Sequence, residues 1–203
     1  MKQGQEETYY EAIIKVMLHE IKIRRPNWEI SYAQNDYLPN LIKTVEANLC
    51  TKTRFPEGAI PPLKVDILFA IKRTENQDAA DLILFEVKRD ALQLVDYSQL
   101  FGYLFAGKYI DTGVLFRVIR EGDKGKLTIV SSPEFDSILK TNKLPLKFLV
   151  KDETINKDLD FQIGISSAVA SEVVCQKPVW IQTQNNKGIC STDELIERIE
   201  NRI

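Results

Sequence analysis

Residues 64–88 read KVDILFAIKRTENQDAADLILFEVK, and in this stretch two apolar runs flank a polar segment. Each run has the length and the β-branched and aromatic content of a strand, while the polar segment at 72–80 is typical of a turn. The second run is apolar on both of its faces as far as Glu86, as in a central strand that is covered from both sides. The stretch therefore predicts a hairpin at the centre of a sheet.

The apolar spacing in the rest of the chain predicts further helices and strands around this hairpin. We expect helices at 8–23, 38–49, 91–107, 135–139 and 165–175 and from Ser191 onward, and strands at 28–32, 114–120, 126–130 and 179–183. The strands at 114–120 and 126–130 flank EGDKG, which predicts a second hairpin. The order of the elements indicates an α/β (α+β) protein, with a core at 1–133 and a C-terminal α/β extension at 134–203 that packs on the same domain.

Charged residues gather at one end of the predicted central hairpin. Glu86 and Lys88 share a face of their strand, because side chains alternate. A turn centred at 76–77 places Asp66 opposite position 87, within one or two residues, and therefore beside both of them. Two close carboxylates repel each other unless a cation lies between them, and Mg²⁺ suits such a pair because it binds carboxylate oxygens together with water and phosphate. The pattern predicts a metal site that supports hydrolysis of a phosphodiester.

Residues of two predicted helices extend this cluster. Gln99 and Tyr103 are four residues apart, so they share one face of the helix expected at 91–107. Gln99 could bind a metal-bound water, the lysine or a phosphate, and Tyr103 could contact a phosphate or stack on a base. In the first helix, Glu11 lies beside the apolar face and could supply another carboxylate, with Glu20 as the alternative.

The Glu-x-Lys triplet carries little weight by itself, because about one is expected by chance in a chain of this size. A second triplet, Glu20-Ile-Lys22, lies within the first predicted helix and is interpreted as surface. Taken alone, Glu86 and Lys88 would be the solvated end of a strand. Their combination with a cross-strand aspartate and a helical Gln/Tyr pair favours a functional site.

Asp66, Glu86-Val-Lys88 and Gln99-x-x-x-Tyr103, in this order, resemble the PD-(D/E)xK nuclease superfamily. The likeness extends over roughly residues 8–131 and is greatest to RecB-like nucleases and to the N-terminal nuclease domain of type I restriction enzyme motor subunits. Val65 stands where the family motif has its proline.

The resemblance implies a restriction endonuclease-like core, in which a mixed central sheet is flanked by helices. It also implies that Asp66 and Glu86 bind Mg²⁺, or Mn²⁺ in its place, and that Lys88 serves the attacking water. The implied catalytic site comprises Asp66, Glu86, Lys88, Gln99, Tyr103 and, more loosely, Glu11. Lys64, Arg89 and Tyr103 could contact nucleic acid, since the two basic residues lie near the site and attract phosphates.

The expected activity is Mg²⁺-dependent hydrolysis of DNA by an endonuclease of restriction, defence or DNA repair. A stand-alone nuclease of this size commonly needs a second active site to cut both strands, which suggests a homodimer. The alternative is a catalytically inactive module of the same fold that binds nucleic acid or protein.

The composition limits other classes of protein. A single histidine and three scattered cysteines without a CxxC pair exclude the common zinc sites. The net charge of −2 means that nucleic-acid binding has to use a local basic patch. The chain shows neither a signal-peptide pattern nor an apolar run of about 18–20 residues, and free thiols suggest a reducing compartment. We therefore expect a cytoplasmic protein with no membrane span.

Overall fold

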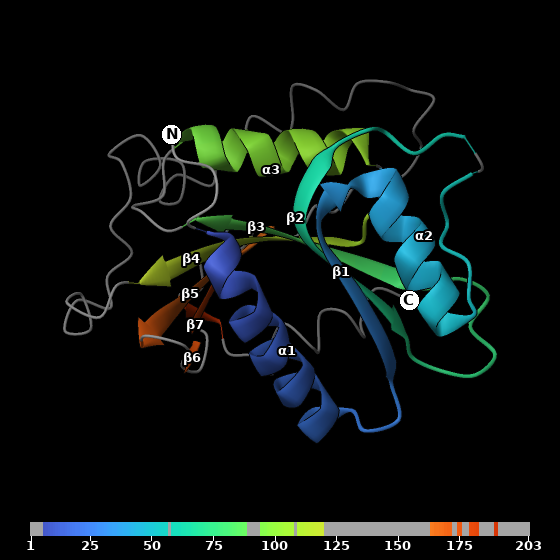
Figure 1. The fold of residues 1–203 in the computed structure, drawn as a ribbon, viewed down its shortest axis with the longest axis horizontal. Helices are drawn as coiled ribbons and strands as arrows, with labels where there is room; N and C mark the ends of the chain where they lie inside the picture. Colours follow the sequence, from blue (N-terminus) through green and yellow to red (C-terminus); the bar gives the residue numbers. More distant parts are fainter. Residues whose placement is uncertain are drawn as a thin grey trace.

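A mixed β-sheet forms the centre of the molecule, and helices cover both of its faces (Figure 1). The computed structural model describes residues 6–56, 58–88, 94–107, 109–119, 163–171, 174–175, 179–182 and 189–190. The strand order is β1-β2-β3-β4-β5-β7-β8, and β6 pairs with β5. The strands are β1 (Glu29–Tyr37), β2 (Lys64–Lys72), β3 (Asp81–Lys88), β4 (Thr112–Ile119), β5 (Ile163–Ser171), β6 (Val174–Cys175), β7 (Val179–Gln182) and β8 (Ile189–Cys190). The mixed α/β class expected from the sequence is confirmed.

Strands β2 and β3 form the central hairpin that the sequence predicts. They pair antiparallel from Ile67 with Phe85 to Ile71 with Asp81, and extending this register by one residue places Asp66 opposite Glu86. The other edge of β2 pairs antiparallel with β1, whereas β4 lies parallel to β3. The chain passes from β3 to β4 through α3 (Leu94–Ala106), because parallel neighbours require a crossover connection. Strand β3 is thus an inner strand, buried as far as Val87.

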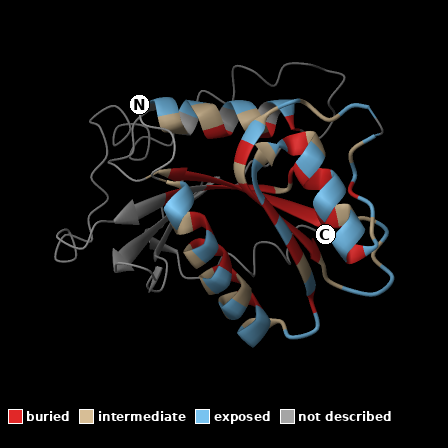
Figure 2. Ribbon diagram, viewed as in Figure 1, coloured by how far each residue is buried: buried red, intermediate tan, exposed pale blue. Residues whose placement is uncertain are grey.

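Helix α1 (Tyr10–Arg24) covers one face of the sheet after the short 3₁₀ turn η1 (Glu7–Tyr9), and α2 (Leu38–Leu49) and α3 cover the other. Figure 2 shows the result, with the buried stripe of α1 turned to the sheet and its outer side exposed. The stripe has helical spacing and consists of Tyr10, Ile13, Ile14, Met17 and Ile21. Fully burying one such side chain contributes about 1.5–3 kcal/mol, so this stripe accounts for the docking of α1.

The helices predicted at 8–23, 38–49 and 91–107 match α1, α2 and α3 closely. Helix α1 ends where Pro26 approaches, since the residue before a proline is driven out of the helical conformation. None of the helices in the described part of the chain has the length and hydropathy needed to cross a membrane.

The prediction of a helix at 165–175 is wrong, because β5 and β6 occupy this segment. Strand β5 pairs parallel with β4 from Ile163 to Val169, and β7 pairs on its other side. A segment rich in Ser and Ala has little intrinsic preference for a strand, so the two neighbouring strands override the local sequence. The strand predicted at 179–183 is confirmed as β7, and the one at 28–32 extends to Tyr37.

The second predicted hairpin is not formed by β4, because its neighbours are the parallel strands β3 and β5. The partner expected at 126–130 lies outside the described residues, as do the helices expected at 135–139 and from Ser191. Strands β5, β7 and β8 extend the sheet beyond β4. The division into a core at 1–133 and an extension at 134–203 that packs on the same domain stays a prediction.

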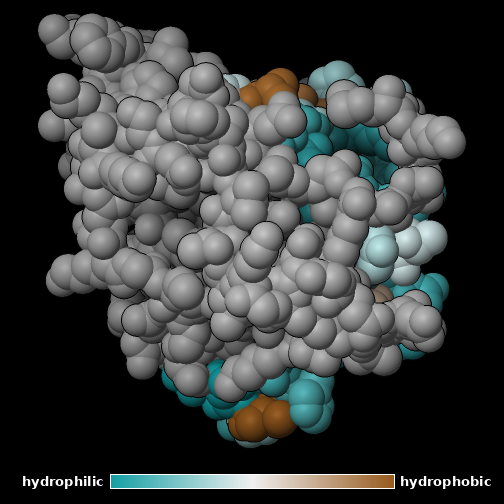
Figure 3. Space-filling model, turned by 90° about the vertical axis from the view of Figure 1, so that its left-hand side faces the viewer, coloured by the Kyte–Doolittle hydropathy of each residue, from teal (hydrophilic) through white to brown (hydrophobic). Residues whose placement is uncertain are grey.

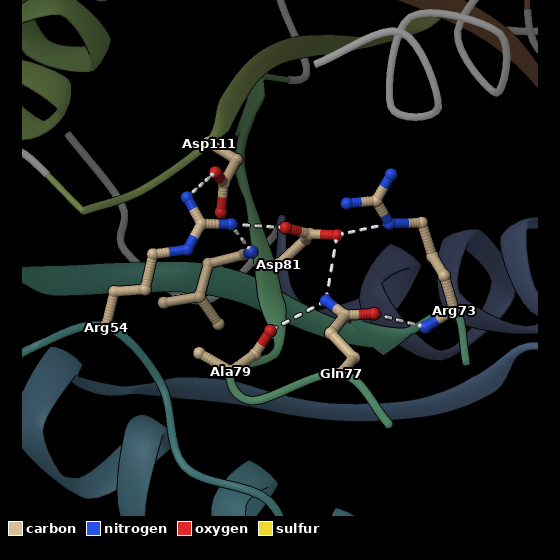
Figure 4. A network of polar contacts seen from close by, with 7 residues as sticks. Arg54, Arg73, Gln77, Ala79, Asp81 and Asp111 are labelled. Atoms are coloured by element: carbon tan, nitrogen blue, oxygen red, sulfur yellow. Dashed lines mark hydrogen bonds and ion pairs between the residues drawn. The ribbon is translucent and has the colours of Figure 1, made fainter. Parts of the chain in front are cut away.

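A buried polar network closes the end of the sheet where β3 begins (Figure 4). The guanidinium of Arg54 bridges Asp81 and Asp111, and Arg73 Nε lies 2.7 Å from Asp81 Oδ2. Gln77 completes the network, because its Nε2 donates to Ala79 O at 2.6 Å and to Asp81 Oδ2 at 3.1 Å. The network ties the loop before β2 and the turn before β3 to the start of β3.

Candidate active site

Five of the predicted site residues meet at the opposite end of β3, where the strand leaves the core: Asp66, Glu86, Lys88, Gln99 and Tyr103. In Figure 1 the arrowheads of β3 and β4 point to the left. Seen from that side, the described side chains that are visible are mainly hydrophilic, with apolar patches at the top and the bottom (Figure 3). The end of an inner strand is a place where charged side chains can be fixed by the fold and still reach solvent.

Glu86 and Lys88 form an ion pair, with Lys88 Nζ 2.6 Å from Glu86 Oε1. The side chain of Glu86 is only 3% exposed, whereas that of Lys88 is 18% exposed. Burial and the charge of Asp66 raise the pKa of Glu86 to about 7, although the lysine lowers it. Burial lowers the pKa of Lys88, but the carboxylates of Glu86, Asp96 and Asp66 outweigh burial and raise it above its ordinary value. Lys88 is therefore an ammonium ion at neutral pH.

Asp66 lies beside this pair and accepts a hydrogen bond on each carboxylate oxygen. The hydroxyl of Tyr10 donates to Oδ1 at 2.6 Å, and the backbone N–H of Val87 donates to Oδ2 at 2.7 Å. Burial raises the pKa of Asp66, and these two bonds together with Lys88 and Lys64 reduce the rise without cancelling it. The charge of Asp66 raises the pKa of Glu86, so the two carboxyl groups interact electrostatically.

Helix α3 closes the site from the side. Lys88 Nζ donates to Gln99 Oε1 at 3.4 Å, and Gln99 Nε2 donates to the hydroxyl of Tyr103 at 2.8 Å. Asp96 Oδ1 lies 3.9 Å from the same ammonium group. Gln99 and Tyr103 thus share a face as their spacing predicts, and a continuous chain of polar contacts runs from Glu86 to α3.

The two carboxylates predicted on the first helix, Glu11 and Glu20, are not among the residues that make the contacts described above. Glu11 is exposed, and the contact from α1 to Asp66 is made by its neighbour Tyr10. Glu20 binds Arg24 at 2.6 Å and lies ten residues, about 15 Å, along the helix from Tyr10. The geometry does not favour Glu20, and a role for Glu11 stays a prediction.

Three residues near the site were missed by the sequence reasoning: Tyr10, Asp96 and Glu6. Tyr10 belongs to the apolar stripe of α1, and this stripe was interpreted as core alone. Asp96 precedes Gln99 by three residues and so shares its helix face, a signal that the spacing rule could have found. The charge of Glu6 contributes to raising the pKa of Glu86, and no pattern in the sequence marks it.

Of the three residues expected to contact nucleic acid, the structure describes two, Lys64 and Tyr103. Lys64 is exposed at the start of β2, and its charge lowers the pKa of Asp66. The side chain of Tyr103 is partly buried, with its hydroxyl bonded to Gln99. Arg89 lies outside the described residues.

The donor set fits a hard divalent cation bound by few protein ligands. The described residues contain no group of three or more His, Cys, Asp and Glu side chains that could hold a metal ion. Asp66 and Glu86 would therefore supply two carboxylates, and water and phosphate oxygens would supply the remaining ligands, an arrangement that Mg²⁺ accepts. Burial raises the pKa of both carboxyl groups, and a cation bound between them would lower both pKa values and favour the ionised pair.

Comparison of the chain with protein-family models, with curated proteins and with solved structures found no match.

Proposed function

We propose that the protein is a Mg²⁺-dependent deoxyribonuclease, an endonuclease that hydrolyses phosphodiester bonds of DNA. The observation that carries the proposal is the pair of buried carboxyl groups, Asp66 and Glu86, beside an ammonium group at the end of an inner strand. A restriction endonuclease-like core is part of the proposal. It is supported by the order of antiparallel β1–β2–β3, then α3, then parallel β4.

Each residue of the cluster has a chemical role in this proposal. Asp66 and Glu86 would hold the metal ion, and the bound ion would supply Lewis-acid activation of the phosphate and of the attacking water. Lys88 is already protonated, so it stabilises the negative charge that develops on the phosphate oxygens and orients the water, and it does not remove the water's proton. Gln99 fixes the position of the ammonium group, and Tyr103 fixes Gln99.

A plasmid-cleavage assay with Mg²⁺ tests the proposal. Wild-type protein is expected to nick or cut the plasmid, and EDTA is expected to abolish cleavage. Lys88→Ala should lower the rate by at least about 100-fold, since positioned charge of this kind typically contributes that much. Lys15→Ala is the matched control, because Lys15 is exposed on α1. Cleavage by Lys88→Ala at the wild-type rate, or no cleavage of double-stranded, single-stranded or branched DNA, would contradict the proposal.

A second function is favoured by one feature of the same site. Lys88 already neutralises Glu86, and both oxygens of Asp66 accept hydrogen bonds, so the cluster is satisfied without a metal ion. A catalytically inactive module that binds nucleic acid or protein would have such a site. DNA binding without Mg²⁺-dependent cleavage, and without any shift of the melting temperature by Mg²⁺, would support this alternative.

A further inference from the structure

Tyr10 reaches the site from an element that is otherwise part of the core. It is the first residue of α1 and is 4% exposed, packed in the cluster that joins α1 to the sheet. A buried tyrosine hydroxyl needs a polar partner, and here the partner is Oδ1 of Asp66 at 2.6 Å. Because the ring is held by packing, the position of the hydroxyl is fixed before any ligand binds.

The Asp66 carboxylate is thereby held at both of its oxygens by rigid donors. One donor is the hydroxyl of Tyr10 on α1, and the other is the backbone N–H of Val87 on β3. Two donors on different oxygens restrict rotation of the carboxylate about its bond to Cβ. Each oxygen keeps a second lone pair, so the group can still bind a cation.

The sheet itself is distorted at this residue. Val65 packs with α2 and α3, whereas Ile67 packs with α1, although residues two apart in a regular strand share a face. On the neighbouring strand Asn35, which the register places opposite Asp66, has a φ of 55°. Residues held in the left-handed region within a strand are costly and concentrate at functional sites. The distortion interrupts the alternation at Asp66, which contacts both Tyr10 on α1 and Val87 on β3.

We propose that Tyr10 is a positioning residue for metal binding, which orients Asp66 so that its free lone pairs converge with those of Glu86. The inference rests on the proposed function. Mg²⁺ requires ligands in near-ideal octahedral positions, whereas Ca²⁺ accepts oxygen ligands in a flexible geometry. Loss of the hydroxyl should therefore weaken the response to Mg²⁺ more than the response to Ca²⁺.

The test compares Tyr10→Phe with Tyr9→Phe, an identical change at the preceding, partly buried residue. In Tyr10→Phe the Mg²⁺ concentration for half-maximal plasmid cleavage is expected to rise about 10-fold or more, the usual effect of removing a partner of a metal ligand. The Ca²⁺ concentration that half-maximally raises the melting temperature should rise less, and binding of a DNA duplex in EDTA should not change. Tyr9→Phe should behave as wild type in all three measurements.

Melting curves with each metal ion separate the inference from the proposed function. Metal ions that bind the folded protein raise its melting temperature, so the loss of Mg²⁺ response in Tyr10→Phe can be measured without cleavage. A wild-type response to Mg²⁺ in Tyr10→Phe, or an equal loss of both metal responses with a lower melting temperature in EDTA, would overturn the role of Tyr10. Wild-type protein that binds Mg²⁺ but cuts no DNA would overturn only the proposed function. Wild-type protein without any metal response would overturn both.

Discussion

At the scale of single residues, the unusual property of the site is a carboxyl group that resists ionisation. The folded-state pKa of Glu86, about 7, lies above its ordinary value of 4.5, so the folded protein holds this proton more tightly than the unfolded chain does. The contribution of this proton to stability is complete below the ordinary pKa. It is lost as the pH rises from about 4.5 through about 7. Above that pH, in the absence of a metal ion, the ionised Glu86 destabilises the fold.

Glu86→Gln is therefore expected to stabilise the protein at alkaline pH. Urea denaturation in EDTA should show a free energy of unfolding about 1–3 kcal/mol above wild type at pH 8, where the amide avoids a buried charge. At pH 4.5 the difference should nearly vanish, since the wild-type carboxyl is then mostly protonated in the folded state. Glu11→Gln, a change of an exposed acid, should show no such pH dependence. A stability gain that is the same at both pH values would contradict the raised pKa.

Asn35 gives a second prediction, because its φ of 55° suits glycine better than any side chain. Asn35→Gly should leave the free energy of unfolding unchanged or raise it slightly. Asn35→Val should lower it by about 1–2 kcal/mol, the cost of a left-handed conformation for a branched residue. Thermal unfolding of the two variants measures the difference. Equal stability of the glycine and valine variants would show that the left-handed conformation is not retained in solution.

Local rules explain why most of the candidate site could be predicted from the sequence. Strand alternation brings Glu86 and Lys88 together, and helical spacing does the same for Gln99 and Tyr103. The turn position gave the register of Asp66 to within one residue. Tyr10 could not be predicted, because its contact with Asp66 depends on how α1 docks on the sheet and on the distortion at Asn35.

At the scale of elements, strand β3 carries a polar cluster at each end. The network around Asp81 lies at its start, and the candidate site with Glu86 and Lys88 lies at its end. Asp81 and Lys88 are seven residues apart, which is about 23 Å along a strand. The cluster at Asp81 consists of hydrogen bonds and ion pairs that join a loop and a turn to the strand (Figure 4). It contributes to stability and lies far from the proposed chemistry.

Asp81→Asn should destabilise the protein without changing its activity. Asp81 is 4% exposed and pairs with both Arg54 and Arg73, so the substitution leaves two guanidinium groups with less compensation. We expect a loss of about 2–3 kcal/mol in the free energy of unfolding, below the full cost of breaking a buried ion pair because Arg54 is partly exposed. Asp78→Asn, a change of a nearby exposed acid, is the control. A fall in the cleavage rate of folded Asp81→Asn protein would contradict the separation of the two clusters.

The elements also show where sequence patterns fail. The central hairpin and the three helices follow from apolar periodicity that the observed packing satisfies. Most of strand β5 was predicted as a helix, because its parallel pairing with β4 joins segments that are distant in the sequence. Pairing of this kind is decided by the whole sheet and leaves little trace in the local sequence.

At the scale of the whole molecule, the sheet places the candidate site where four elements converge. Strand β2 supplies Asp66, and β3 supplies Glu86 and Lys88. Helix α3 supplies Gln99, and α1 supplies Tyr10 from the opposite face of the sheet. Because α1 and α3 lie on different faces, the geometry of the site depends on how both helices dock on the sheet. A shift of α1 would break the hydrogen bond from Tyr10 to Asp66, and a shift of α3 would break the one from Lys88 to Gln99. The fold class followed from the order of elements, but this convergence follows only from the assembled sheet.

The number of proposed cutting centres in each chain leads to the last prediction. Under the proposed function, Asp66 and Glu86 form one cutting centre in each chain. A monomer should therefore nick supercoiled plasmid before any linear product forms, whereas the expected homodimer should cut both strands in one encounter. Sedimentation velocity over a range of protein concentrations, combined with the ratio of linear to nicked plasmid at each concentration, measures both quantities. The linear fraction should rise in parallel with the dimer fraction. Linear product without a nicked intermediate at concentrations where the protein sediments as a monomer would contradict one cutting centre per chain.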